Sequence, residues 1–343
     1  MKRIILIVIA VLLVGGGFFA FQKYQAFWLP NVPNDLGKTV LEIPTGSNFS
    51  EVVDLLHENG MVNDTSTFIE VANRLSYVKN PMRAGRYRIK KGWNNLSLVR
   101  HLRGGKQETV KVVLSTARMS EEVAGKVAAT LEFDSLTLQT LWQDDKYLKE
   151  IGYSRETLMS LFIPNTYDLF WNTSPKKFTE RMIKEHAKFW AKKGRKEKAE
   201  AMKRTPEEVY ALASIVEKET NKISERPRMA GVYLNRLRIG MPLQADPTSV
   251  FATRDFTTKR VTDYHTTFDS PYNTYMYRGL PPGPIAMSSI ASIDAVLNSE
   301  DHKYLYFCAV GDGSGSHNFA KTLTQHNQNA AIYRKNLKKR GRR

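Results

Sequence analysis

The polarity of the chain changes sharply near its start. Lys2 and Arg3 precede an uncharged apolar run of 18 residues, from Ile4 to Phe21. That length lies near the lower limit of about 17–25 residues for a helix that spans a bilayer. Aromatic side chains follow the run, as they do at a membrane interface. The pattern therefore predicts a cytoplasmic tip and single transmembrane anchor in residues 1–21, followed by a polar tether in residues 22–38.

A cleaved signal peptide is the competing interpretation of the apolar run. Its apolar region would be about 7–15 residues long and would end at a small-x-small cleavage site. No convincing site of that kind follows Phe21, which favours an uncleaved anchor. Because basic flanks tend to stay in the cytoplasm, Lys2 and Arg3 predict a cytoplasmic N-terminus. The rest of the chain is then expected outside the cytoplasmic (inner) membrane.

Residues 39–105 alternate between strand patterns and helix patterns. Residues 39–43 alternate as a strand does, and Asn48 with Glu51 forms a capping pair for a helix that ends at Gly60. A second helix follows, then a strand in GRYRIK and a third helix in NNLSLVRHLRGG. One interpretation is a packing domain or spacer. The sharper one is a carbohydrate-binding module that resembles LysM, in which a helix pair lies between two strands.

Residues 106–204 form a connecting region with helix and strand patterns. Its last part, residues 176–204, holds twelve Lys or Arg against four Glu. The favoured interpretation is a solvated helix that packs Phe178, Ile183, Phe189 and Trp190 inward. A surface that faces a membrane or a polyanion is the alternative.

Composition narrows the range of partners. The 343 residues include 51 Lys or Arg and 34 Asp or Glu, so the formal net charge of +17 favours anionic surroundings. A single Cys excludes an intramolecular disulfide framework and a Cys-based zinc cluster. The chain has no zinc-finger spacing, RNP-like strand or Gly-rich phosphate loop, and the predicted anchor further disfavours nucleic acid as a partner.

The segment TPEEVYALASIVEKET, residues 205–220, combines helix signals with candidate chemistry. Thr205 is expected to cap the helix and Pro206 to occupy its first position. Its apolar stripe consists of Val209, Leu212, Ala213 and Val216. One further step of four from Ala213 reaches Glu217, which is therefore expected on, or at the border of, the buried face.

Partial burial is expected to raise the pKa of Glu217 above the reference of about 4.3, as a general acid requires. Glu219 lies about 200° further round the helix and is expected to point to solvent. The competing interpretation is a structural Glu217 that pairs with a buried cation such as Arg236.

Five motifs follow one another in order: ASIVEKET, VYLNRLRIGMPLQADPTS, YNTYMYRGLPPGPI, YLYFCAVGDGSGSHNF and TLTQHN. In residues and spacing this series resembles the YceG-like family of endolytic murein transglycosylases. The resemblance is strong over about residues 205–333 and looser over the anchor and the LysM-like module. It implies an enzyme that cuts the MurNAc–GlcNAc linkage inside peptidoglycan glycan strands and leaves a 1,6-anhydroMurNAc end. The resemblance also implies that the enzyme acts near peptidoglycan synthases. It further implies that the catalytic acid is Glu217, the first Glu of VEKET.

One stretch departs from the family pattern. Members often carry E-G-x-x-F-P-D-T-Y before the catalytic helix, whereas this chain reads MSLFIPNTY, with Met159–Ser160 and Asn165 at the differing positions. Any role that an acidic residue has at these positions in other members is therefore absent from this chain.

A lytic transglycosylase can work with one carboxylate, because the 6-hydroxyl that attacks C1 belongs to the same sugar. Asp246 is the reserve candidate for a second carboxylate, although its neighbour Pro247 equally suits a turn. The matched motifs also supply polar groups expected to bind the sugar or to form structural hydrogen bonds: Asn235, Gln244, Asp246, Asn273, Tyr275 and His317. His317 and His326 lack a third partner for a metal, and no cofactor is expected.

The sequence thus predicts an α+β protein with an N-terminal transmembrane helix, a small LysM-like module and a larger α+β catalytic domain with its core in residues 205–343. Two rival functions stay open. One is a hydrolytic muramidase with a second carboxylate. The other is a non-catalytic peptidoglycan-binding scaffold at the membrane.

Overall fold

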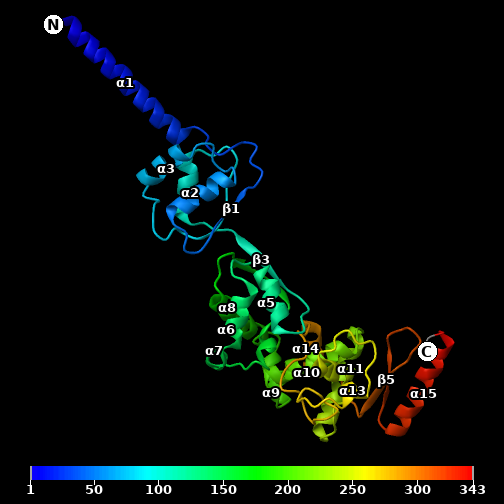
Figure 1. The fold of residues 1–343 in the computed structure, drawn as a ribbon. Coiled ribbons are helices and arrows are strands. Elements are labelled where there is room, and N and C mark those ends of the chain that lie inside the picture. The colour runs from blue at the N-terminus through cyan, green and yellow to red at the C-terminus, as the bar shows by residue number, and fades with distance from the viewer. Residues whose placement is uncertain (1, 342–343) are drawn as a thin grey trace. The chain divides into compact units, whose positions relative to one another are not determined.

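The protein is described here by a computed structural model that covers residues 2–341. The described chain divides into two compact units. Unit 1 holds the residues up to 111 together with 130–132 and 168–174, and unit 2 holds the rest. The fold is mixed helix and sheet, as the sequence predicts (Figure 1). The division of the chain into five segments, drawn from the sequence, stays a prediction.

Unit 1 begins with a long apolar helix, α1, which stands away from the rest of the unit over most of its length (Figure 1). It is the one helix among the described residues that is long and apolar enough to cross a membrane. Only its last turns are held by the unit: Ala26 is buried, and the Ala26 carbonyl accepts a 2.9 Å hydrogen bond from Asn95. The structure is thus compatible with the predicted anchor. The elements of unit 1 are α1 (Lys2–Trp28), β1 (Val40–Ile43), α2 (Phe49–Glu58), α3 (Thr65–Arg74), β2 (Gly85–Arg88) and α4 (Asn95–Gly104).

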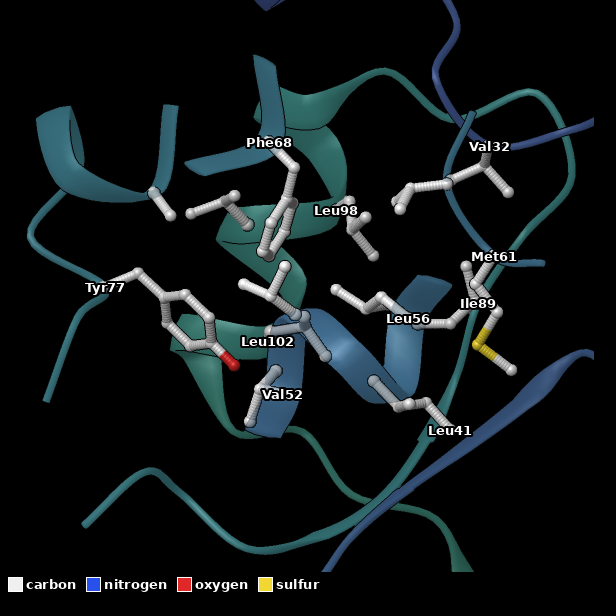
Figure 2. Close-up of a cluster of buried hydrophobic side chains, with 14 of the residues drawn as sticks. Val32, Leu41, Val52, Leu56, Met61, Phe68, Tyr77, Ile89, Leu98 and Leu102 are labelled. Carbon is white, nitrogen blue, oxygen red and sulfur yellow. The ribbon is translucent and has the colours of Figure 1, made fainter. Parts of the chain in front are cut away.

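The predicted strand–helix–helix–strand order of the small module is confirmed. β1 pairs with β2 in antiparallel register, and the helix pair α2 and α3 lies between them in sequence. Asn48 and Glu51 form the expected reciprocal cap at the start of α2. Figure 2 shows the apolar side chains of these elements converging on one core, with Phe68, Leu56 and Leu98 at its centre. The LysM-like character of this module and its binding of carbohydrate stay predictions.

Two strands, β3 (Thr109–Leu114) and β4 (Asn165–Phe170), pair with each other where the chain passes from unit 1 to unit 2. Unit 2 is mainly helical. Its first half holds α5 (Ser120–Ala128), α6 (Ser135–Gln143), α7 (Asp145–Glu150), η1 (Leu158–Leu161), α8 (Pro175–Trp190) and α9 (Arg195–Ala201). Its second half holds α10 (Pro206–Glu219), η2 (Ile223–Glu225), α11 (Arg226–Arg238), α12 (Asp246–Thr253), α13 (Asp263–Thr266), α14 (Ile290–Leu297), β5 (Tyr306–Ala309), β6 (His317–Ala320) and α15 (Leu323–Lys339).

The basic stretch of residues 176–204 forms two of these helices, α8 and α9. Of the four side chains predicted to pack inward, Phe178 and Trp190 are buried, while Ile183 and Phe189 are half-buried. Most of the lysines on these helices are exposed. The charge therefore sits on an ordinary amphipathic surface.

The core of unit 2 surrounds α10. This helix packs against α14, α11 and α12, and every residue from Val209 to Val216 is buried. Thr205 and Glu208 form a capping box and Pro206 starts the helix, as expected. The sequence predicts one apolar stripe on α10, whereas the structure buries this helix on all sides. The stripe therefore accounts for only part of the packing of α10. Any side chain at its C-terminal end is consequently close to neighbouring elements.

The hairpin of β5 and β6 is antiparallel, with Ala309 opposite His317. Helix α15 packs on both strands. This arrangement holds the start of β6 near the end of α10, where Glu219 and His317 line the same cavity.

Candidate active site

Glu217 and Glu219 lie at the C-terminal end of α10 but have opposite surroundings. The Glu217 carboxylate accepts hydrogen bonds from Ser289 Oγ at 2.5 Å and Ser292 Oγ at 2.5 Å, and from Arg226 Nη1 at 3.0 Å. Ser289 caps α14, so this carboxylate also lies at a helix N-terminus, which favours an anion. These donors favour the ionised form of Glu217.

The predicted rise in the pKa of Glu217 is wrong. Burial pushes this pKa upward, but the hydrogen bonds from Ser289 and Ser292 and the charge of Arg226 together hold it below its ordinary value. Glu217 is paired with a buried cation, as the competing interpretation expects. The partner is Arg226, however, and not Arg236.

The predicted solvent orientation of Glu219 is also wrong. Tyr233 of α11 donates a 2.7 Å hydrogen bond to Glu219 Oε1, and the carboxyl group lies among the side chains that line three cavities. Burial raises the pKa of Glu219 to about 7, the charge of Asp246 adds to this, and Tyr233 and Arg236 oppose it. The helical-wheel argument fails because the chain turns after Thr220 and returns as α11 against this end of α10.

A polar cavity of about 340 Å³ lies on one side of Glu219. Arg236, Gln244, Asp246 and Tyr275 line it, so three sequence-predicted site residues meet there. Tyr275 donates a 2.5 Å hydrogen bond to Asp246 Oδ1, which orients that carboxylate. Gln244 has a φ of 48°, a backbone conformation uncommon for residues other than glycine.

A second cavity, of about 480 Å³, lies beside the same carboxyl group. Asn221, Lys222 and His317 are among its lining residues. His317 Nδ1 lies 2.8 Å from Glu225 Oε2, and Glu225 also accepts the backbone N–H of His317 at 3.2 Å. The imidazole is therefore held in one orientation at the cavity wall.

Two predicted site residues are not brought to these cavities. Asn235 is buried, and its amide donates to the carbonyls of His302 at 2.7 Å and Tyr304 at 3.0 Å. Asn273 is fully buried, and its amide faces three carbonyls of residues 265–268 at 2.8–3.1 Å. Both asparagines hold loops in place by structural hydrogen bonds, which is the alternative open for each of them from the sequence.

Four residues that contact the two glutamates were not predicted, because no pattern in the sequence distinguishes them: Arg226, Tyr233, Ser289 and Ser292. The sequence gives one usable hint for Glu219, namely the unbroken apolar run before the E-K-E triplet, which marks α10 as a fully buried helix. Within residues 2–341 no group of three or more His, Cys, Asp or Glu is arranged to hold a metal ion.

Glu219 thus presents a carboxyl group with a raised pKa to these cavities, and a general acid requires a group of this kind. The model of the YceG-like family matches residues 41–332, so the chain belongs to this family. It is 28% identical to an endolytic murein transglycosylase of Bacillus subtilis strain 168, over 92% of this chain and 90% of the relative. It is 27% identical to an endolytic murein transglycosylase of Streptococcus pneumoniae serotype 2, over 95% of this chain and 64% of the relative.

A solved structure resembles the fold as well. The crystal structure of a yceG-like protein from Listeria monocytogenes superposes with a TM-score of 0.57 at 27% sequence identity. The match covers 84% of this chain and 97% of that one. The likeness to this structure therefore extends beyond the motif region to most of the chain.

Proposed function

We propose that this chain is an endolytic lytic transglycosylase that cleaves MurNAc–GlcNAc bonds of peptidoglycan glycan strands and leaves 1,6-anhydroMurNAc ends. Its family and the names of its relatives support the enzyme class. The observation that carries the proposal is the half-buried Glu219 carboxyl, which lines three cavities and accepts a hydrogen bond from Tyr233. Burial raises its pKa to about 7, so a large fraction is protonated at neutral pH.

In the proposed reaction the Glu219 carboxyl gives its proton to the glycosidic oxygen as the bond between that oxygen and C1 of MurNAc breaks. The 6-hydroxyl oxygen of the same MurNAc then forms a bond to C1. Its proton passes to the Glu219 carboxylate, which restores the acid. Because the nucleophile is tethered, no separate base is needed to activate water.

The surrounding groups fit the two halves of this cycle. Asp246 keeps the pKa of Glu219 high, which favours proton donation, while Tyr233 and Arg236 lower it and favour the carboxylate that forms next. Gln244, Tyr275 and His317 offer hydrogen bonds to sugar hydroxyls from the cavity walls. Glu217 holds Arg226 and the start of α14, which positions the end of α10.

The catalytic role of Glu217 inferred from the family resemblance stays a prediction. An ionised carboxylate with three hydrogen-bond donors is poorly suited to donate a proton, so we assign that step to Glu219. Glu219→Gln and Glu217→Gln form a matched pair that separates the two assignments.

A hydrolytic muramidase is the second candidate, because Asp246 lines two of the cavities that Glu219 lines. Mass spectrometry of the products of purified glycan strands decides between them. Anhydro ends are expected from the transglycosylase, and reducing ends would show hydrolysis. A chain that binds strands without cutting them would match the scaffold function.

We further propose that α1 spans the cytoplasmic membrane with its N-terminus inside and unit 2 outside, near peptidoglycan synthases. The basic residues Lys2 and Arg3 before the apolar run support this orientation. Protease treatment of intact spheroplasts tests it. A C-terminal tag should be digested, and a protected tag would reverse the orientation.

A further inference from the structure

The third cavity beside Glu219 differs from the other two in its chemistry. It measures about 260 Å³, and side chains such as Val250, Phe251 and Ile285 give it a mainly apolar wall. Two cationic residues, Arg118 and Lys218, line one part of it, and the acidic residues Glu219 and Asp246 line another. A small apolar pocket with a cationic edge suits a ligand that combines methyl groups with a carboxylate.

These two cations lack the partners that the other cavities provide. Arg236 donates to the carbonyls of Leu305 and Leu243 at 2.6 Å, and Lys222 donates to Ser316 at 2.6 Å. Within residues 2–341, neither the Arg118 guanidinium nor the Lys218 ammonium forms an ion pair with a carboxylate. The two cations also act on each other: burial and then the charge of Arg118 lower the pKa of Lys218, while the weaker effects of the charges of Glu217 and Glu122 oppose this. An anion placed between them would relieve this repulsion.

The position of Arg118 is fixed by its neighbours. The Ala117 carbonyl accepts a 2.7 Å hydrogen bond from the backbone N–H of Met287, and the Arg118 N–H donates to Glu122 Oε2 at 3.2 Å. The Arg118 guanidinium lies 4.6 Å from the centre of the Phe256 ring. The cation is thus held at the cavity by its backbone and by the Phe256 ring.

We propose that this cavity binds the peptide carried by a MurNAc residue next to the cleaved bond, with a peptide carboxylate on Arg118 and Lys218. The peptide joins its sugar through a lactyl group, so methyl groups and carboxylates lie close to the glycan backbone. Glu219 lines this cavity and the two polar ones, so a sugar at the acid can place its peptide here. This inference rests on the proposed function and makes the enzyme selective for peptide-bearing strands.

The test compares three lipid-free strand preparations: peptide-bearing, peptide-bearing with amidated carboxyl groups, and peptide-stripped. The full chain in detergent is assayed for release of anhydro ends, and kcat/KM is measured for each preparation. The wild type should prefer the first preparation by about tenfold, mainly through KM, as expected for one charge-assisted hydrogen bond. In the double variant Arg118→Gln/Lys218→Gln this ratio should fall toward one.

The matched control is Lys149→Gln/Arg260→Gln, which removes two exposed cations outside the cavities and should keep the wild-type ratio. Ratios within one enzyme preparation cancel any loss of folded protein. Equal wild-type rates on the first two preparations would overturn the inference, as would a double variant that keeps the preference. Absence of anhydro ends from every preparation would instead contradict the proposed function.

Discussion

The phenol of Tyr233 donates a 2.7 Å hydrogen bond to the carboxyl group of Glu219 inside unit 2. Two positions earlier, Glu217 is ion-paired with Arg226 and bonded to two serines. One helix end therefore holds one carboxyl group with a raised pKa and one with a lowered pKa. Two carboxyl groups whose pKa values are pushed apart mark an acid–base assignment.

The pH dependence of the rate follows from Glu219. Its pKa of about 7 means that the acid form is lost as pH rises through that value. We therefore expect kcat/KM on glycan strands to fall with rising pH above about 7 and to level off below it. A pH–rate profile of the full chain measures this. A fall centred near pH 4 or 5 would assign this descending limb of the profile to a carboxyl group with an ordinary pKa.

Two neighbours should move that limb in opposite directions. Tyr233→Phe removes a hydrogen bond that lowers the pKa of Glu219, so the limb should shift to higher pH. Asp246→Asn removes a charge that raises this pKa, so the limb should shift to lower pH. The pH–rate profiles of the two variants check both signs. Shifts in the same direction would contradict the assignment of the limb to Glu219.

Glu217 should affect stability with the opposite pH dependence. Its pKa is lowered in the folded chain, so its stabilising effect is present above the unfolded-state pKa and is lost as pH falls through the folded-state pKa. At neutral pH, Glu217→Gln leaves the buried Arg226 without its counter-ion, which costs about 3 kcal/mol. Thermal unfolding should therefore show a large difference from wild type at pH 7 that shrinks in acid. A difference that is constant with pH would argue against the ion pair.

Asn273 should matter for folding more than for chemistry. Its amide faces three loop carbonyls and is fully buried, so Asn273→Ala is expected to lower the free energy of unfolding by about 3 kcal/mol. Asn221→Ala, at an exposed position, serves as the control. The apparent Tm of the full chain checks this. Equal Tm values for the two variants would show that the buried amide contributes little.

The sequence predicts the elements of this fold well where local signals are strong. The caps at Asn48 and Thr205 and the alternation in residues 39–43 are local, and each is found where expected. The apolar run after Arg3 likewise forms one long helix. Such signals depend only on neighbouring residues, which a sequence contains directly.

The site is predicted less well because its contacts are distant along the chain. Ser289 and Ser292 reach Glu217 from more than 70 positions away, and Tyr233 reaches Glu219 from the next helix. A helical wheel considers only the positions of Glu217 and Glu219 around α10. It therefore misses the other elements that cover the end of that helix. The motifs did locate Gln244, Asp246, Tyr275 and His317 at the cavities, while Asn235 and Asn273 support the loops.

The rate of strand cleavage by Glu219→Gln, measured beside Glu217→Gln at pH 6 on the same purified strands, tests the central claim most directly. The glutamine keeps the shape of the side chain but removes the proton that is donated. We expect Glu219→Gln to lose about 10²–10⁴-fold in the release of anhydro ends, and folded Glu217→Gln to lose much less. Near wild-type cleavage by Glu219→Gln, with activity abolished in folded Glu217→Gln, would return the general-acid role to Glu217.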